Sequence, residues 1–456
     1  MTGSYSLRDS EFRKWIWRLM VPLALQQLLL TGVNIVNSLM FGRFGELEIA
    51  ASTQATNIVS IFITACYAFS GTGRILASQY WGKRDPRSIR TVIGISLRYT
   101  LIETSLFAFL FLTVPKTIMG FFSSDPEVVA LGAVYLRIVA VGLYFYSISN
   151  LIYQTESALE KPQYTLVGSL ISYPCNILVN YILIFGKLGF RPMGLAGAAI
   201  GYLTGRAIDF IFTVSIFARD KRIGFRPRDI FERNKLLSKD YFNVLKPIFA
   251  HEVTWGVANS MGAIITGQLS TIAVTAYNIC YMYDTLVIAL VHGMGGAAGA
   301  IIGKILGSDD IDGAKRASRT LLTYAGLLGG ILAVFLLLTG RVFIGFYNIS
   351  SETVALARTL MYIFSVNVFC QAFEIVGLIG ILRAGGSGHV GFWTDIAFMW
   401  GVAIPLGWLS AFMWKLSPIL VVILNRVDMP IKATVGIITI LRMKWLKNLT
   451  RENPTE

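Results

Sequence analysis

The chain has 456 residues, of which 54% are hydrophobic and only 14% are charged. Soluble domains carry about 25% charged residues, so this composition excludes an ordinary water-soluble protein and indicates a chain largely surrounded by lipid. The basic residues behind the net charge of +14 fall between apolar runs, as in cytoplasmic loops. We therefore expect a lipid bilayer around the chain and no nucleic-acid partner.

About 20 apolar residues cross a bilayer as a helix. With that length, we predict six spans near residues 15–42, 48–80, 88–113, 127–155, 163–186 and 194–218. Six more follow near residues 241–270, 275–306, 313–340, 352–384, 389–413 and 416–440. Arg426, Asp428 and Lys432 interrupt the twelfth span. We expect this span to shift toward the membrane interface, with Asp428 and Lys432 paired one helical turn apart.

The loop charges predict the orientation of these spans. Both ends of the chain, together with the loops that follow even-numbered spans, hold 26 basic residues, whereas the opposite loops hold six. The positive-inside rule then predicts that both termini lie in the cytoplasm. We expect a multi-pass protein of the plasma membrane. We assign residues 13–218 to an N-terminal six-helix lobe, 219–240 to a cytoplasmic linker, 241–440 to a C-terminal six-helix lobe and 441–456 to a tail.

The two predicted lobes share an internal repeat. Residues 120–131 (GFFSSDPEVVAL) and 345–356 (GFYNISSETVAL) align without gaps, with six of twelve positions identical. The same offset of 225 relates Pro22 to Pro247 and Asn34 to Asn259. Six spans per half give both halves the same orientation. The sequence therefore predicts an all-α membrane protein of twelve transmembrane helices, in two lobes related by a pseudo-two-fold axis along the membrane normal.

Several segments of the second half resemble multidrug and toxic compound extrusion (MATE) transporters. They are residues 247–262 (PIFAHEVTWGVANSMG), 276–279 (AYNI), 293–307 (GMGGAAGAIIGKILG) and 380–395 (GILRAGGSGHVGFWTD). Residues 34–45 (NIVNSLMFGRFG) look like the counterpart in the first lobe. The resemblance implies a V-shaped pair of six-helix bundles that exports organic cations in exchange for inward-moving H⁺ or Na⁺.

The first lobe departs from the pattern that this resemblance implies. Many prokaryotic members of the family carry coupling aspartates in spans 1 and 5, and the matching positions here look like Asn37 and Asn180. An amide cannot titrate, and it offers a cation only a neutral oxygen. We therefore look for ion coupling in the second lobe.

Three carboxyl residues of the second lobe are the main candidates for ion coupling. Glu252, Glu374 and Asp395 lie roughly 17, 14 and 9 Å from the cytoplasmic ends of spans 7, 10 and 11, at about 1.5 Å per residue. Charged groups at such depth are costly, so we expect one cluster that holds either H⁺ or Na⁺. The alternative is a set of structural ion pairs. Asp284 in span 8 is a further coupling candidate.

Polar and aromatic residues are candidates for binding cargo. Asn34 with Asn37, and Asn176 with Asn180, each share a helix face and are expected either to line a cavity or to form amide bonds between helices. Aromatic faces hold lipophilic cations through cation–π contact, although packing is the commoner role of such residues. The candidates in the second lobe are Trp255, Asn259, Tyr277 and Tyr281.

These patterns favour a secondary antiporter that exports amphipathic organic cations or drugs by alternating access. The alternative is a flippase for a lipid-linked saccharide or a phospholipid-like substrate, whose cavity should be basic. An enzyme is not expected, because the chain shows no catalytic constellation and no phosphate-binding loop. We predict no catalytic residue, no resident cofactor, no metal other than Na⁺ held by Glu252, Glu374 and Asp395, and a monomer.

Overall fold

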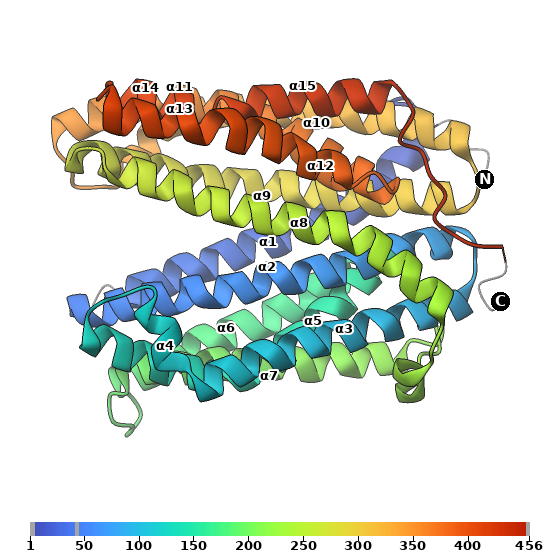
Figure 1. The fold of residues 1–456 in the computed structure, drawn as a ribbon, viewed down its shortest axis with the longest axis horizontal. Helices are drawn as coiled ribbons and strands as arrows, with labels where there is room; N and C mark the ends of the chain where they lie inside the picture. The colour runs from blue at the N-terminus through green and yellow to red at the C-terminus, as the bar shows by residue number, and fades with distance from the viewer. Residues whose placement is uncertain (1–4, 42–44, 453–456) are drawn as a thin grey trace. The chain divides into compact units, whose positions relative to one another are not determined.

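The computed structural model describes residues 5–41 and 45–452, and every regular element within them is a helix. The first half contains α1 (Ser10–Phe41), α2 (Glu46–Gly82), α3 (Pro86–Thr113), α4 (Pro115–Gly120), α5 (Pro126–Ala158), α6 (Gln163–Phe185), α7 (Gly194–Arg219) and the short 3-10 helix η1 (Pro227–Phe231). The second half contains α8 (Lys235–Gly267), α9 (Thr271–Gly307), α10 (Ile311–Gly345), α11 (Ser351–Phe373), η2 (Glu374–Leu382), α12 (His389–Thr394), η3 (Asp395–Ala403), α13 (Ile404–Trp408), η4 (Leu409–Met413), α14 (Pro418–Asn425) and α15 (Asp428–Leu441). Figure 1 shows these elements along the chain.

Among the described residues, ten helical segments are long and apolar enough to cross a membrane. They correspond to predicted spans 1–6 and 8–11. Helix α8, at the predicted seventh span, is more polar because it carries His251, Glu252 and Asn259. The predicted twelfth span is divided into α14 and α15. Asp428 and Lys432 pair one turn apart as expected, and Lys432 is fully buried within the protein, whereas the expected shift of this span toward the membrane interface stays a prediction.

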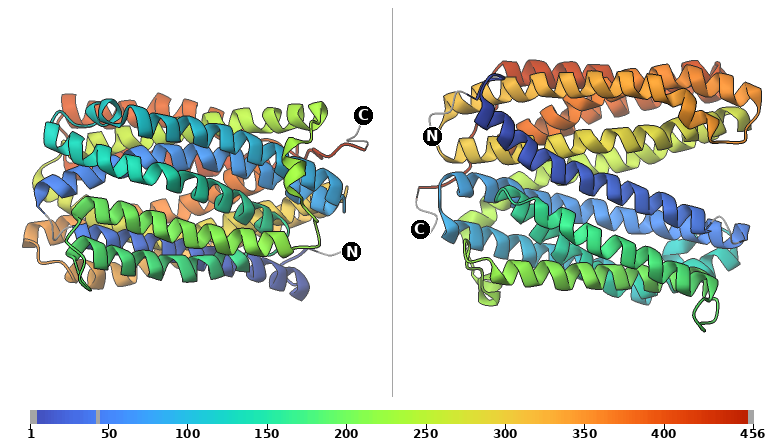
Figure 2. Two further views of the ribbon diagram at one scale, coloured as in Figure 1. Left: turned by 90° about the horizontal axis from the view of Figure 1, so that it is seen from below. Right: turned by 180° about the vertical axis from the view of Figure 1, so that it is seen from behind.

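The helices pack as two compact units. One comprises residues 28–245 and 451–456, and the other comprises residues 1–27 and 246–450. These boundaries differ from the predicted lobes, since the first part of α1 packs with the second-half helices and the first part of α8 packs with the first-half helices. Both exchanged segments end close to a proline inside the helix, Pro22 or Pro247. Figure 2 shows the same helices from two further sides.

Small residues allow the helices of the first-half unit to approach closely. On α7, a Cβ atom added to Gly197, Gly201 or Gly205 would lie within 3.0 Å of backbone or side-chain atoms of α6. These glycines recur every four residues, which is the spacing of close helix contacts in membranes. The polar side chains of Asn176 and Asn180 therefore lie directly against the α7 backbone.

The second-half unit is built around α9, the most buried of its apolar spans. Its core joins α9 to residues of α10 and α11 and to Phe12, Ile16 and Leu19 of α1. At Gly293, an added Cβ would lie 2.6 Å from the backbone nitrogen of Ala24. Glycine at this position is thus required for α1 to pack on α9.

The internal repeat has a structural counterpart at the start of the fourth membrane span of each half, which is α5 in the first half and α11 in the second. Asp125 caps α5 by accepting a hydrogen bond from the backbone N–H of Glu127, and Ser350 caps α11 by accepting one from Thr353. The two caps are separated by the repeat offset, so the aligned residues perform the same task in both halves.

The predicted linker is fastened to the first-half unit. Arg222 pairs with Glu156 of α5 at 2.8 Å and also with Asp220. Partial burial opposes ionisation of Asp220, but the hydrogen bonds and positive charge of Arg222 outweigh it, so the pKa of Asp220 is lowered. Arg98 of α3 holds η1 by donating to the carbonyl oxygens of Ile230 and Glu232.

The close packing at Gly293 predicts that an added methyl group destabilises the protein there more than at Gly330. Gly293→Ala should lower the midpoint of thermal unfolding in detergent, because the added carbon meets the α1 backbone. The control is Gly330→Ala on α10, where nothing lies within 4 Å of the added Cβ and a neutral or slightly stabilising effect of up to about 1 kcal/mol is expected. Equal midpoints for the two variants would contradict this packing.

Candidate functional site

Lys432 on α15 is the centre of a buried charged cluster. Its ammonium nitrogen lies 2.7 Å from Asp395 Oδ1, 3.1 Å from Asp428 Oδ2 and 3.3 Å from Glu374 Oε1. The lysine side chain is fully buried, and less than a tenth of each of these three carboxylate side chains is exposed. Because an unpaired ammonium group in such surroundings would be very costly, the three carboxylates are what allow Lys432 to remain charged.

A second basic residue extends the cluster to α8. Arg383 contacts Glu252 Oε1 through Nη1 at 2.8 Å and His251 Nδ1 through Nη2 at 2.8 Å. Arginine can only donate, so His251 Nδ1 is the acceptor and the ring proton lies on Nε2. That nitrogen faces Asp395 Oδ2 at 3.4 Å. Glu252, Arg383, His251, Asp395 and Lys432 thus form one continuous chain of polar contacts.

Two acidic members of the cluster occupy equivalent positions in irregular helix. Glu374 is the first residue of the π-helical segment η2, and Asp395 is the first residue of η3. π-Helical turns are rare and occur mostly at functional sites, because the additional residue per turn redirects side chains. Lys432 lies one turn inside α15, which restarts at Asp428 after the helix break. Local helix distortion therefore directs all of these groups to one place.

The cluster holds more acid than base. Four carboxyl groups, those of Glu252, Glu374, Asp395 and Asp428, share the two basic side chains of Arg383 and Lys432. Asp395 Oδ2 and Asp428 Oδ2 are buried without a well-oriented hydrogen bond. With all four acids ionised the cluster carries an excess negative charge, so it is suited to bind a small cation or protons.

The predicted trio of Glu252, Glu374 and Asp395 is therefore brought into one network. The sequence patterns did not predict that the other members would join this cluster. These members are His251, Arg383, Asp428 and Lys432. The spacing of Asp428 and Lys432 was the available signal, since an i,i+4 pair within an apolar stretch can be buried as well as interfacial. Nothing in the sequence pattern distinguishes Arg383 from an ordinary loop arginine.

Asp284 lies apart from this cluster. It is buried on α9, and its Oδ1 atom has no hydrogen-bond partner among the described residues. The aromatic pair on the same helix, Tyr277 and Tyr281, is stacked with ring centroids 6.0 Å apart. Arg426 lies over both rings, donates to the Tyr277 hydroxyl at 3.0 Å and is 4.4 Å from the ring of Phe364. The protein's own arginine thus occupies the aromatic face predicted for cargo.

Trp255 and Asn259 follow Glu252 on the same face of α8 and are both exposed. The Trp255 side chain is 39% exposed, and Glu252, at 15%, is more exposed than Glu374, Asp395 or Asp428. An accessible tryptophan one turn from a carboxylate offers a cation both a π face and an opposite charge. Glu252 is therefore the end of the charged cluster best placed to meet a ligand.

In the first-half unit the predicted asparagines form an amide cluster. Asn180 Nδ2 donates to Asn37 Oδ1 at 2.9 Å, and Asn176 Oδ1 lies 3.4 Å from the side-chain nitrogens of both Asn37 and Asn180. Asn34 is exposed and does not join this group. The cluster thus joins α1 to α6 by neutral hydrogen bonds, which corresponds to the second of the two roles expected for these residues.

Among the described residues, no group of three His, Cys, Asp or Glu side chains is arranged to hold a metal ion. In this arrangement Glu374 and Asp395 instead face the ammonium group of Lys432. Binding of Na⁺ at the predicted carboxyls would therefore require Lys432 or Arg383 to move.

Loss of Lys432 should be strongly destabilising. Lys432→Met leaves buried carboxylates without their counter-charge, and breaking such a pair typically reduces the free energy of unfolding by about 3–5 kcal/mol. Adding Glu374→Gln should restore part of this loss, because one uncompensated charge is removed. Thermal unfolding in detergent compares the two variants with wild type, and a double variant no more stable than Lys432→Met would contradict the pairing.

Comparison with known proteins identifies the family. The sequence profile of the MatE family matches residues 22–182 and again residues 247–409. The two matches begin at Pro22 and Pro247, the residues related by the internal repeat. Together they cover well over half of the chain.

The match to curated relatives extends over most of their length at low sequence identity. The chain is 26% identical over 417 residues to a probable multidrug resistance protein NorM of Agrobacterium fabrum, covering 86% of this chain and 85% of the relative. It is 22% identical over 413 residues to the multidrug resistance protein PmpM of Pseudomonas aeruginosa, covering 89% and 85%.

Solved structures share the fold. An outward-facing multidrug resistance MATE transporter of the MOP superfamily matches with a TM-score of 0.85 at 17% identity, covering 97% of this chain and 99% of that one. A MOP superfamily transporter from Pyrococcus furiosus, described as having a binding pocket of reversed polarity, matches with a TM-score of 0.86 at 17% identity, covering 97% and 98%. The expected two-lobe, twelve-span architecture is confirmed, and the chain belongs to the MatE family of membrane transporters.

Proposed function

We propose that this transporter is a secondary antiporter that exports amphipathic organic cations, and that the charged cluster around Lys432 couples export to the inward movement of H⁺ or Na⁺. The observation that carries the proposal is the excess of carboxyl groups over basic groups in that cluster. The names of the curated relatives, which include multidrug resistance proteins, support drug-like cargo. The proposal is a transport role without catalysis.

The excess charge gives a simple basis for exchange. A carboxylate that binds a proton or Na⁺ loses its attraction for a second cation, so the coupling ion and a cationic cargo exclude each other electrostatically. Where the coupling ion is abundant it displaces cargo. Where the ion is scarce it leaves, and cargo binds again. The direction of export then follows from the ion gradient.

Glu252 is the proposed point of contact with cargo. It is the most exposed acid of the cluster, and Trp255 lies one turn further along α8. A cation that approaches Glu252 competes with Arg383 for the same carboxylate oxygen. Because His251 contacts both Arg383 and Asp395, release of Arg383 would change the hydrogen bonding of Asp395. Asp395 in turn pairs with Lys432. This order of contacts links cargo binding to the buried acids.

The alternative flippase function is less well supported. A phosphate-bearing substrate needs unpaired basic side chains, whereas Arg383 and Lys432 are already paired with carboxylates. Arg426, which is half-buried, is covered by Phe364 and the Tyr277–Tyr281 pair. The charge of the described cluster therefore favours a cationic cargo.

Gradient-driven efflux tests the role of Glu252. In proteoliposomes that accumulate a fluorescent organic cation, Glu252→Gln should reduce efflux driven by an H⁺ or Na⁺ gradient by about tenfold, within the usual range of coupling free energies. The matched control is Glu46→Gln, at an exposed glutamate on the first turn of α2, which should retain efflux. Separate H⁺ and Na⁺ gradients identify the coupling ion. Undiminished efflux by Glu252→Gln would remove the cluster from the mechanism.

The amide cluster of the first-half unit should not be needed for coupling. Asn180→Ala removes the donor to Asn37 and is expected to lower the unfolding midpoint modestly, since such bonds contribute about 0.6 kcal/mol on average. The dependence of efflux on the ion gradient should persist. Loss of that dependence in folded protein would show that the first-half unit does participate.

A further inference from the structure

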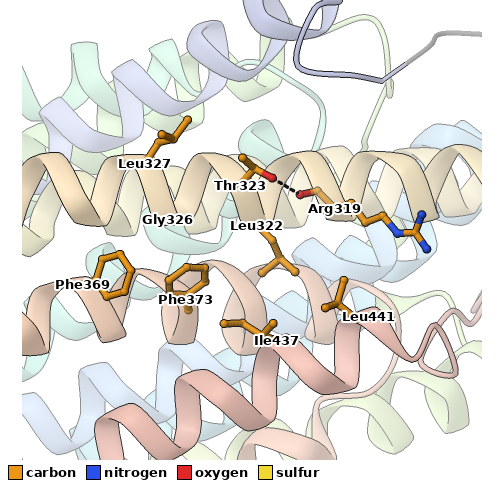
Figure 3. Close-up of a pocket in the computed structure, with 9 residues that line it drawn as sticks. All are labelled: Arg319, Leu322, Thr323, Gly326, Leu327, Phe369, Phe373, Ile437 and Leu441. Atoms are coloured by element: carbon orange, nitrogen blue, oxygen red, sulfur yellow. Dashed lines mark hydrogen bonds between the residues drawn. The ribbon is translucent and has the colours of Figure 1, made fainter.

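An open groove lies on the second-half unit, and no member of the charged cluster described above lines it. Helices α10, α11 and α15 enclose it, and its volume is about 610 Å³ (Figure 3). The lining residues are Arg319, Leu322, Thr323, Gly326, Leu327, Phe369, Phe373, Ile437 and Leu441. All but Arg319 and Thr323 are apolar or glycine, and the Thr323 hydroxyl bonds back to the Arg319 carbonyl oxygen. The wall of the groove is therefore suited to hydrocarbon.

The shape of the groove depends on a small residue in its wall. At Gly326 an added Cβ would lie 2.9 Å from the Phe373 ring, so glycine allows this ring to lie against α10. Phe369 and Phe373 are stacked edge to face, with ring centroids 5.3 Å apart. Two aromatic rings thus form one side of the groove, and Leu327 and Leu322 follow α10 along the other side (Figure 3).

One end of the groove is positively charged. Arg319 is exposed, and its guanidinium group has no ion pair or hydrogen bond within the described part of the chain. In Figure 3 its side chain extends along α10 away from the aromatic rings. Arg442 and Lys444, both exposed, follow Leu441 on the opposite wall. By the positive-inside rule this is the predicted cytoplasmic end.

The dimensions fit a lipid. Arg319 and Leu327 are eight residues apart on α10, about 12 Å along the helix axis. With Arg319 at the depth of the headgroups, a groove of this length would reach into the hydrocarbon region of one leaflet. An acyl chain would lie against Leu322, Phe369 and Phe373, and a phosphate group would reach Arg319. A cationic cargo would be repelled by Arg319.

We propose that this groove is a binding site for an anionic glycerophospholipid of the cytoplasmic leaflet. The occupant is specified by charge complementarity at Arg319, the one basic residue among the described residues that line the groove, and by the apolar wall beside it. The site lies beside the coupling cluster in sequence, since Phe373 precedes Glu374 and Ile437 follows Lys432 by five residues. A bound lipid would hold α10, α11 and α15 together.

Lipid binding to the purified transporter tests the proposal. In native mass spectrometry, dioleoyl phosphatidylglycerol should bind wild type about fivefold more tightly than dioleoyl phosphatidylcholine, as expected for one basic group at a membrane surface. Arg319→Gln should abolish this preference. The matched control is Arg87→Gln, at an exposed arginine on the first turn of α3, which should retain it.

A fluorescent probe in the groove distinguishes lipid binding there from lipid binding elsewhere on the protein. Thr323→Cys carries a fluorophore in a Cys175→Ala background, because the other three cysteines are buried. Brominated phosphatidylglycerol in vesicles should quench this probe more strongly than brominated phosphatidylcholine, and Arg319→Gln should equalise the two lipids. Equal quenching by both lipids in the labelled parent, or an unchanged preference after Arg319→Gln, would overturn the proposal.

Discussion

The structure depends on keeping ionised groups inside a protein that is surrounded by hydrocarbon. Lys432 is fully buried, and it is tolerated because Asp395, Asp428 and Glu374 surround its ammonium group. The same requirement explains the irregular backbone nearby. Two π-helical segments and a helix break direct acid and base to one point. A buried charged network of this kind is fragile if one partner is removed. In our proposal, this sensitivity lets the cluster respond to the binding of one ion.

The two halves use related helices for different purposes. The repeat gives both halves an N-cap at an equivalent position and a proline at an equivalent position in the first span, yet the polar interior differs. The first-half unit contains a neutral amide cluster around Asn180, whereas the second-half unit contains the carboxyl-rich cluster around Lys432. Neutral amides bind helices together without titrating, so the ability to exchange an ion is confined, in our proposal, to the second half.

Sequence patterns were sufficient for the architecture and for part of the site. Hydropathy, loop charge and the repeat predicted the spans, and the depth of Glu252, Glu374 and Asp395 predicted that they would cluster. The partners were harder to predict. The burial of Lys432 among three carboxylates depends on how α15 packs against η2 and η3, which is a tertiary effect. That Arg426, which directly follows α14, covers Tyr277 and Tyr281 of α9 depends on the tertiary fold, which no local pattern records.

The most direct test of the account is to measure the ions released when cargo binds. Purified transporter in weakly buffered detergent, loaded with H⁺ or with radioactive Na⁺, is titrated with a lipophilic cation such as tetraphenylphosphonium while pH and free Na⁺ are recorded. The account predicts that cargo binding displaces one of the two ions, and that Glu374→Gln reduces the amount displaced. Cargo that binds wild type without releasing either ion would contradict the exchange.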